Sequence, residues 1–199
     1  MASDYRAADN EWEARYRRGE TGWDRGGVSP AVGHWQTTGY LRAGDRLLVP
    51  GCGRGHEVVA LARAGLAVTG VDLAPSAVAA TRAALTVAGV EATVVEADLL
   101  AWEPAAPFDA IYEQTCLCAL APADWPAYAL RLARWLRPGG HLLAHFLQTG
   151  RAGGPPFDCV VAAMRTLFAA PTWRWSAREP WGIDHPNGLR ELAYPLDRR

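Results

Sequence analysis

Three glycines that alternate with other residues stand directly after an apolar run: Gly51, Gly53 and Gly55. Glycine lets the backbone approach a ligand where a Cβ atom would collide with it. A turn of this kind after a strand is a typical nucleotide-binding position in α/β proteins. Asp72 ends a second apolar run about 20 residues later, and a carboxylate there can hold the hydroxyl groups of a ribose. The spacing therefore predicts a site for a ligand that contains a ribose.

The third glycine comes one residue too early for the dinucleotide pattern Gly-x-Gly-x-x-Gly, which would place glycine where His56 stands. A pyrophosphate needs the helix N-terminus and close backbone approach. A ligand with ribose and adenine but no phosphate does not, and S-adenosylmethionine (SAM) is such a ligand. The glycine pattern therefore favours a SAM-dependent methyltransferase over a nicotinamide dehydrogenase.

Acidic residues follow two further apolar runs. Asp98 comes after residues 93–97 and Glu113 after residues 108–112. Ligands of open parallel sheets bind outside the carboxyl ends of the strands, so Asp98 is predicted to lie near the adenine. Glu113 can cap a turn, face the methionyl end of SAM or face the substrate, and these alternatives stay open. Acids after strands are also common as turn and N-cap residues.

Aromatic residues cluster near the N-terminus. Trp12 and Tyr16 are four residues apart and so share one face of the helix predicted over residues 9–18, and Trp23 follows. Such a face usually packs on a core. The alternative is a lid over the cofactor, because the positive charge of a sulfonium is attracted to the faces of aromatic rings. Composition alone favours packing.

Strand and helix patterns alternate through the middle of the chain, which predicts a parallel sheet with helices on both faces. The predicted strands cover 46–49, 67–71, 93–97, 108–112 and 141–147, and the predicted helices cover 9–18, 56–64, 75–88, 125–136 and 159–168. Pro138-Gly139-Gly140 is expected to stop the helix over 125–136. The segments 173–177 and 190–194 are expected to form an antiparallel hairpin at the sheet edge. We expect one domain, 1–199, in which residues 1–30 form a helix and lid over the cofactor site.

Composition limits the classes of partner. Half of the 199 residues are hydrophobic, 21% are charged and the net charge is −1, as is typical of a globular chain. This balance favours neither nucleic acid nor an anionic membrane as a partner, and no apolar run is long enough to span a bilayer. The four cysteines form no Cys-x-x-Cys pair, and no histidine stands at zinc-ligand spacing. We therefore expect a cytoplasmic protein with a small-molecule substrate and no metal; the oligomeric state is not predicted.

Several blocks of sequence follow one another in a recognisable order. Residues 12–24 contain Trp12 followed by Gly-Glu-Thr-Gly-Trp-Asp, residues 49–57 read Val-Pro-Gly-Cys-Gly-Arg-Gly-His-Glu, and further blocks lie at 108–113, 118–122, 136–140 and 153–157. These blocks resemble those of the thiopurine S-methyltransferase family, including its Val-Pro-Gly-Cys-Gly-x-Gly-x-Asp motif. The resemblance covers about Trp12 to Phe168. Its details look nearer to the halide and thiol methyltransferase branch than to the thiopurine enzymes.

The resemblance implies a SAM-dependent methyltransferase with an α/β, Rossmann-like class I fold and a seven-stranded, mostly parallel sheet. By position, the resemblance implies that Trp12, Tyr16 and Trp23 line the cofactor pocket, with Gly51 at the methionyl end, Asp72 at the ribose, and Asp98 with Leu99 at the adenine. The further implied cofactor-binding residues are Gly53, Gly55, Leu73, Glu113 and Gln114. Glu113 and Gln114 are also the implied catalytic positions. Gln114 stands where the halide branch has tyrosine and the thiopurine branch arginine, which leaves the substrate open. Glu57 and Glu113 replace aspartates of the family and keep the charge.

Methyl transfer from a sulfonium to a nucleophile is an in-line displacement. A soft anionic acceptor such as a thiolate, hydrosulfide or halide needs no strong base, because collinear positioning and exclusion of water are enough. The chain shows no catalytic triad, and Cys116 and Cys118 are expected to pack rather than react. We therefore expect a thiol as the acceptor. The alternatives are an O- or N-methyltransferase that uses Glu113 or a histidine as base, and a non-catalytic module that binds SAM or a nucleotide.

Overall fold

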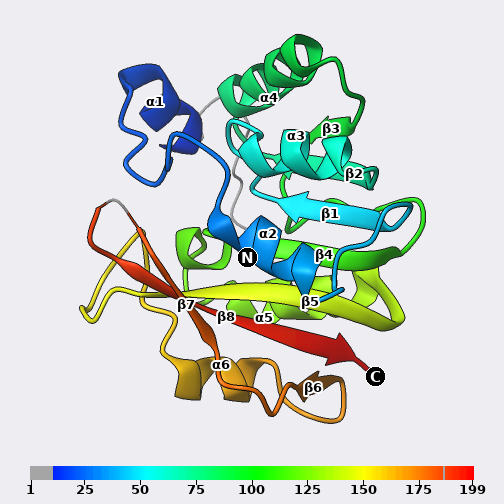
Figure 1. The fold of residues 1–199 in the computed structure, drawn as a ribbon. Helices are drawn as coiled ribbons and strands as arrows, with labels where there is room; N and C mark the ends of the chain where they lie inside the picture. Colours follow the sequence, from blue (N-terminus) through cyan, green and yellow to red (C-terminus); the bar gives the residue numbers. More distant parts are fainter. Residues whose placement is uncertain (1–10, 186) are drawn as a thin grey trace.

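The computed structural model describes residues 11–185 and 187–199, in which helices and strands alternate (Figure 1). The helices are α1 (Glu11–Arg18), α2 (Pro30–Thr37), α3 (His56–Arg63), α4 (Pro75–Ala88), α5 (Trp125–Trp135) and α6 (Val161–Leu167), and a 3₁₀ turn covers Leu117–Ala119. The strands are β1 (Arg46–Pro50), β2 (Ala67–Asp72), β3 (Thr93–Glu96), β4 (Phe108–Gln114), β5 (Leu136–Gln148), β6 (Trp173–Trp175), β7 (Trp181–Asp184) and β8 (Arg190–Arg198). None of the helices in the described ranges is long and apolar enough to cross a membrane.

The described strands form one eight-stranded sheet in the order β3-β2-β1-β4-β5-β8-β6, with β7 paired to β8. Strands β1 to β5 are parallel to one another, whereas β8 is antiparallel to β5, β6 and β7. The chain runs outward from β1 to β3 and then returns to place β4 on the other side of β1. The expected α/β class with a mostly parallel sheet is confirmed, with eight strands where seven were predicted.

Helices cover both faces of the sheet, because successive strand residues point to opposite sides. On one face Leu48 and Ile111 pack in a core with Tyr128 of α5 and Met164 of α6. On the other face the neighbouring residue Leu47 packs in a second core, with Trp35 of α2 and Leu61 of α3. The near-continuous apolar runs of β1 and β4 are explained by this burial on both sides.

Several predicted boundaries need correction. The helix predicted over 125–136 ends at Trp135, and strand β5 begins at Leu136, before the predicted start at 141. Pro138-Gly139-Gly140 therefore lies inside a strand. The strand is irregular there, because the β4–β5 register shifts between Phe108 and Ala110 and Gly139 has a φ of 75°. Residues 9 and 10 of the predicted N-terminal helix lie outside the described residues.

Two elements were not predicted. Helix α2 begins after Ser29, whose hydroxyl accepts a hydrogen bond from the Ala31 N–H (3.3 Å), with Pro30 at its first position. Strand β7 is the eighth strand and pairs with the first half of β8. The segments 173–177 and 190–194 were predicted to pair antiparallel. The antiparallel direction is correct, but the register is not, because β6 pairs with the far end of β8, at residues 196–198.

The parallel strands bring chemistry-bearing residues to one edge. Strands β1, β2 and β4 end at Pro50, Asp72 and Gln114, at the same edge of the sheet. The strand order reverses between β1 and β4, and ligands of open α/β sheets bind at such a point. The fold therefore predicts a binding site beside the loops that follow β1 and β4.

Candidate active site

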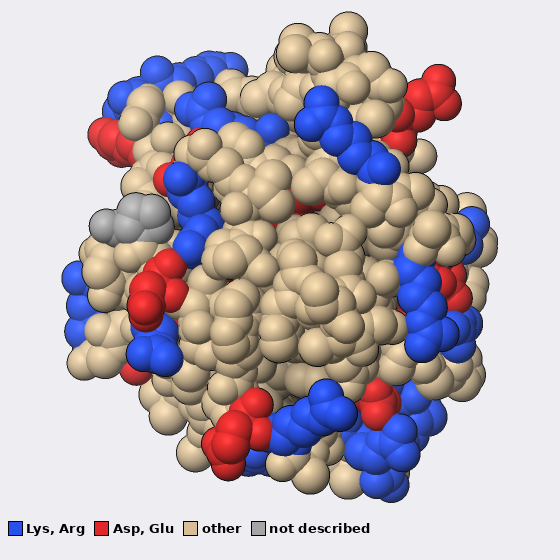
Figure 2. Space-filling model, in the orientation of Figure 1, with Lys and Arg blue, Asp and Glu red and all other residues tan. Residues whose placement is uncertain are grey.

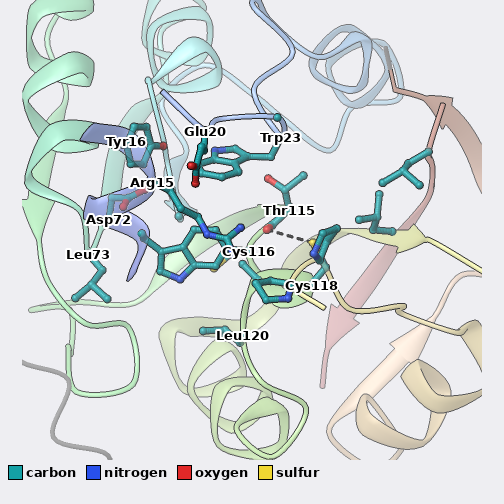
Figure 3. Close-up of a pocket in the computed structure, with 18 of the residues that line it drawn as sticks. Arg15, Tyr16, Glu20, Trp23, Asp72, Leu73, Thr115, Cys116, Cys118 and Leu120 are labelled. Carbon is teal, nitrogen blue, oxygen red and sulfur yellow. Dashed lines mark hydrogen bonds between the residues drawn. The ribbon is translucent and has the colours of Figure 1, made fainter. Parts of the chain in front are cut away.

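A cavity of about 460 Å³ opens at this edge, a size typical of small-molecule sites. Figure 3 shows Tyr16, Asp72 and Leu73 toward one side of it and Thr115 and Cys118 toward the other. Its wall comes from the N-terminal segment, the carboxyl ends of β1, β2 and β3, the loop after β4, the end of β5 with the following loop, and the segment between β7 and β8. The lining residues are Trp12, Arg15, Tyr16, Glu20, Gly22, Trp23, Gly51, Asp72, Leu73, Asp98, Leu99, Thr115, Cys116, Cys118, Ala119, Leu120, Leu147, Arg151, Pro155, Pro156, His185, Asn187 and Leu189.

Gly51 and Asp72 form the floor of the cavity where β1 and β2 end. Gly51 has a φ of 59°, and a Cβ atom there would lie 3.1 Å from Cys116, so glycine is required for this backbone path. The Asp72 carboxylate accepts hydrogen bonds from the N–H groups of Gly53 and Ala74, both at 2.9 Å. Burial raises the pKa of Asp72, and these donors oppose that rise. The carboxylate is thus held in place with acceptor capacity left toward the cavity.

Leu73, Asp98 and Leu99 extend the wall beyond Asp72. Asp98 is fixed by a local turn, in which its Oδ1 accepts a hydrogen bond from the Leu100 N–H at 2.8 Å. Leu99 is 8% exposed, and it belongs to the core cluster that backs this side of the cavity. The structure therefore brings the predicted ribose and adenine residues together along one wall.

The three N-terminal aromatic rings lie on the cavity wall rather than inside the core. Trp23 meets Trp12 edge to face with ring centroids 5.3 Å apart, and it meets Tyr16 in the same way at 5.6 Å. Edge-to-face pairs of this kind are favourable beyond the area they bury. The prediction that composition favoured, packing on the core, is therefore wrong for these rings.

Two carboxylates fasten the aromatic segment to the α/β unit. Glu13 of α1 accepts hydrogen bonds from the backbone N–H (2.9 Å) and hydroxyl (2.8 Å) of Ser76, at the start of α4. Burial opposes ionisation of Glu13, but these bonds and Arg17 outweigh it and lower the pKa of Glu13. Asp24 lies 2.8 Å from Arg54 and 3.0 Å from His56, on the glycine loop and the first turn of α3. The segment over the cavity is thus held at both its ends.

Four predicted site residues lie elsewhere. Gly53 and Gln114 line a smaller adjoining cavity of about 60 Å³, which shares Tyr16 and Gly51 with the main one. Gly55 and Glu113 line neither cavity. A Cβ atom on Gly55 would lie 2.6 Å from Cγ2 of Thr81, so this glycine serves the packing of α3 against α4.

Glu113 is buried beneath the loop after β4, with 1% of its surface exposed. Its Oε1 accepts a hydrogen bond from the Leu117 N–H at 2.7 Å, and this bond holds the loop. Burial, with a smaller contribution from the Glu191 charge, raises the pKa of Glu113 to about 8. Its position indicates a structural role, in contrast to the catalytic role that the resemblance implied.

We expect Glu113→Gln to keep turnover within about twofold of the wild type and to change how stability depends on pH. Because the folded-state pKa of about 8 lies above the ordinary 4.5, the contribution of Glu113 to stability is fully present below 4.5 and is lost as pH rises toward 8. The wild type should therefore lose on the order of a few kcal/mol more unfolding free energy between pH 5 and pH 9 than the variant does. Urea unfolding at the two pH values measures this difference. A tenfold loss of turnover with an unchanged pH dependence would instead support the catalytic role.

The far side of the cavity was not predicted as part of the site. It is formed by Thr115, Cys118, Arg151, Pro155, Pro156, His185, Asn187 and Leu189. Thr115 has a φ of 59°, which is unusual for a residue other than glycine and is typical of functional loops. The Gly-Pro block at 153–157 was a matching motif of the resemblance, so a signal for this part existed. His185 and Leu189 had none, because only the pairing of β8 with β5 and β7 brings them to the cavity.

The four cysteines are free and buried: Cys52, Cys116, Cys118 and Cys159. Burial raises the pKa of Cys116 and Cys118 well above the usual range, which disfavours the reactive thiolate. The Cys118 thiol donates to the Thr115 carbonyl oxygen at 3.3 Å (dashed in Figure 3). These observations agree with the expected packing role. Within the described residues no group of His, Cys, Asp and Glu side chains is arranged to hold a metal ion.

The sheet and the position of the cavity define the class of protein: an α/β fold of the SAM-dependent methyltransferase type. Solved structures of this type match most of the chain. A Burkholderia thailandensis 1,6-didemethyltoxoflavin-N1-methyltransferase with bound S-adenosylhomocysteine matches with a TM-score of 0.76 at 20% identity, over 96% of this chain and 87% of that one. The Synechocystis magnesium protoporphyrin IX methyltransferase matches with a TM-score of 0.71 at 18% identity, over 85% and 80%.

The family follows from the sequence comparison. Residues 7–191 match the family model described as thiopurine S-methyltransferase (TPMT). The chain belongs to this family and is a SAM-dependent methyltransferase. Similar proteins include a probable thiol methyltransferase 2 of Arabidopsis thaliana (38% identical, over 76% of this chain and 68% of that protein) and thiocyanate methyltransferase 1 of Brassica oleracea (36%, over 92% and 82%). A thiopurine S-methyltransferase of Azotobacter vinelandii is 30% identical over 94% and 98%.

The residues present fit SAM as the cofactor. Gly51 brings the backbone to the cavity wall in a left-handed conformation that favours glycine, and the Asp72 carboxylate is held at the cavity by two backbone donors. Aromatic rings line the same cavity, which suits a cationic sulfur.

Proposed function

We propose that this chain transfers the methyl group of SAM to the sulfur, or a comparable soft nucleophile, of a small molecule. The observation that carries the proposal is that one cavity, the main one, runs from the Asp72 wall to an acceptor side formed by the loop after β4 and the segment before β8. A donor and an acceptor that share one cavity can be held collinear at short range, and this positioning is the main requirement of an in-line displacement.

The predicted cofactor residues receive roles from their places on the wall. Asp72 would hold the ribose hydroxyl groups, with Leu73 beside it, and Asp98 and Leu99 would contact the adenine. Gly51 would let the methionyl end lie against the backbone. All of these residues line the same cavity.

The aromatic segment would close over the reacting centre. Trp12, Tyr16 and Trp23 line the cavity and would face the sulfonium, where aromatic rings attract positive charge and exclude water. We propose that the N-terminal segment, of which the structure describes residues 11–30, acts as this lid within a single domain of 199 residues. SAM supplies a methyl group already activated by the positive charge on sulfur, so the chain's task is to bind, orient and keep water out.

The acceptor side favours an apolar thiol. Cys118, Leu120, Leu147, Pro155 and Leu189 form its apolar part, and Thr115, Arg151, His185 and Asn187 form its polar part. The wall of the whole cavity is mostly apolar, which favours a weakly hydrated sulfur nucleophile over a strongly hydrated oxygen one. The names of the similar plant and bacterial proteins, thiol, thiocyanate and thiopurine methyltransferases, agree with this class of acceptor.

We also propose a reducing, cytoplasmic compartment, in agreement with four free and buried cysteines. Nucleic acid and membranes are not proposed as partners. On the face drawn in Figure 2, arginine side chains are interspersed with acidic ones rather than gathered into a basic patch.

The test is methyl transfer from isotopically labelled SAM to a panel of acceptors: aliphatic and aromatic thiols, hydrosulfide, a thiopurine, thiocyanate, iodide, a phenol and an amine. We expect turnover with at least one sulfur acceptor, and a kcat/KM at least about tenfold above that for the phenol and the amine. Preference for the oxygen or nitrogen acceptor would overturn the sulfur proposal. Binding of S-adenosylhomocysteine without turnover on any acceptor would favour a non-catalytic module.

A further inference from the structure

A buried histidine and carboxylate lie together at the acceptor side of the cavity. His185 lines the cavity with 3% of its side chain exposed, and its Nε2 lies 3.0 Å from Oε1 of Glu191, whose side chain is fully buried. The backbone N–H of His185 donates to the Leu189 carbonyl (2.8 Å), and the backbone N–H of Gly188 donates to the His185 carbonyl (3.0 Å). These bonds hold the backbone of His185, and so position the residue at the cavity.

The carboxylate is held from the opposite side by β4. Glu191 Oε2 accepts a hydrogen bond from Nε2 of Gln114 at 2.6 Å. The Gln114 amide is fixed in turn, because its Oε1 accepts from the Tyr112 hydroxyl (2.8 Å) and its Nε2 also donates to the Ser29 hydroxyl (3.2 Å). This network gives Gln114, an implied catalytic position, the function of orienting Glu191.

The pair is close but incompletely bonded. His185 Nε2 and Glu191 Oε1 are both buried, and neither makes a well-aligned hydrogen bond to any part of the chain that the structure describes. A buried polar atom without a hydrogen bond costs about 1–3 kcal/mol, so such a pair needs an explanation. Catalytic hydrogen bonds are often poorly aligned before the substrate binds and shorten in the complex. The position of the pair at the cavity agrees with this explanation.

The other histidines are unsuited to act on a substrate. His145, also buried, uses both ring nitrogens, because Nε2 accepts from the Trp35 indole N–H (2.9 Å) and Nδ1 then donates to the Glu113 carbonyl (2.7 Å). His56 and His141 pair with aspartates, and His34 stacks on Trp181 at 4.4 Å. None of these four lines the main cavity.

We propose that His185 is the general base that accepts the proton of a thiol acceptor, and that Glu191, oriented by Gln114, is the positioning residue that stabilises the resulting imidazolium. This inference rests on the proposed function. The S–H bond breaks and its proton passes to the imidazole, and the thiolate electron pair forms the new bond to the methyl carbon. The bond between that carbon and the sulfonium sulfur breaks, its electrons stay on that sulfur, and the imidazolium later releases the proton to water.

Charge favours this step at this place. A carboxylate 3.0 Å away stabilises a protonated imidazole, so the proton transfer creates an ion pair rather than an isolated buried cation. Several other titratable groups interact electrostatically with this pair: Glu57 of α3, Tyr112 and Glu113 of β4, Cys118 of the 3₁₀ turn, His145 of β5 and Cys159 after β5. The charged Arg25, before α2, donates to the carbonyl of Asp184, the residue before His185 (2.7 Å).

The test compares two thiols of similar size that differ in ionisation. At pH 7.5, 4-nitrothiophenol is already a thiolate, whereas phenylmethanethiol is mostly protonated and needs a base. We expect His185→Gln to lower kcat/KM for phenylmethanethiol about 100-fold more than for 4-nitrothiophenol, a ratio within the usual range of general-base catalysis. Glu191→Gln should lower kcat for phenylmethanethiol by about tenfold with little change in KM, and should shift the pH profile.

His34→Gln is the matched control, because this histidine packs against β7 outside the main cavity; it should not change the ratio of the two thiols. Calorimetric titration with S-adenosylhomocysteine shows that each variant is folded. Equal losses for the two thiols in His185→Gln would overturn the inference alone. A wild type that methylates neither thiol would overturn the inference, and one that methylates no acceptor of the whole panel would overturn the proposed function as well.

If His185→Gln does not fold, the pH dependence of kcat/KM in the wild type tests the inference instead. With a protein base, kcat/KM for phenylmethanethiol reaches a plateau below the pH at which this thiol ionises in water. Without one, the rate constant rises about tenfold per pH unit until that pH, because it follows the thiolate fraction, and this result would contradict the inference.

Discussion

Replacing Asp72 with alanine should weaken the binding of S-adenosylhomocysteine at least about 100-fold. The Asp72 carboxylate is the anionic group held where β2 ends, with both oxygens oriented by backbone N–H groups at 2.9 Å. A hydrogen bond to a charged group contributes about 1.5–3 kcal/mol. Two such bonds to ribose hydroxyl groups therefore account for about 3 kcal/mol or more, and every 1.4 kcal/mol is tenfold in affinity.

Calorimetric titration of both proteins measures this loss, and Asp109→Ala is the matched control. Asp109 also accepts a backbone N–H, that of Arg46 at 2.8 Å, and it pairs with Arg137, but it stands at the start of β4, away from the edge that holds the cavity. Asp109→Ala should change thermal stability and leave the affinity for S-adenosylhomocysteine within about threefold of the wild-type value. Equal losses of affinity in the two variants would show that Asp72 acts through the fold and not on the ribose.

Replacing Gly55 with alanine should lower stability by roughly 3 kcal/mol, because two costs add at this position. A left-handed backbone costs an alanine about 1–2 kcal/mol, and extra atoms in a packed core cost about 1–3 kcal/mol. Gly55 has a φ of 79°, and its Cβ would lie 2.6 to 2.9 Å from three atoms of Thr81. Thr81 cannot rotate away freely, because its hydroxyl donates to the Gly53 carbonyl at 2.9 Å. For a chain of this size the melting temperature should fall by about 6–12 °C.

Gly89→Ala separates the two costs. Gly89 follows α4 and, like Gly55, has a left-handed backbone, with a φ of 65°, but a Cβ there would have no heavy atom within 4 Å. Gly89→Ala should lower the free energy of unfolding by only about 1 kcal/mol, and the melting temperature by about 2–4 °C. Equal melting temperatures for the two variants would contradict the contact with Thr81. A Gly55→Ala protein with normal stability but impaired binding of S-adenosylhomocysteine would support the direct cofactor role implied by the resemblance.

The parallel half of the fold was predictable from the sequence because its signals are local. The helix at Pro75–Ala88 has proline in its first turn and glycine after its end, and it was predicted with the observed bounds. The apolar runs of β1, β2 and β4 are long enough to identify, although the predicted strands stop one or two residues before Pro50, Asp72 and Gln114. The antiparallel half was predicted less well. Four-residue β7 contains a glycine, and its pairing with β8 is a tertiary contact.

The cofactor side of the site could be predicted from local sequence signals, whereas the acceptor side could not. Glycines after a strand and acids at the ends of strands place Gly51, Asp72 and Asp98 at one edge as soon as the sheet is parallel, so the sequence alone determined the class of cofactor and placed these three residues at one cavity. The structural role of Glu113 depends on a loop that folds back over its carboxyl group, and no spacing predicts such burial.

Whether the N-terminal aromatic rings pack on the core or line a cavity was decided only by the tertiary structure, through the contacts of Glu13 with Ser76 and of Asp24 with Arg54. The pairing of His185 with Glu191 and Gln114 was decided there as well. The physical reason is the separation in sequence between the residues that interact. Turn conformation and strand ends follow from neighbouring residues, whereas the acceptor side is assembled from segments far apart in sequence, which only the packing of β4, β5, β7 and β8 brings together.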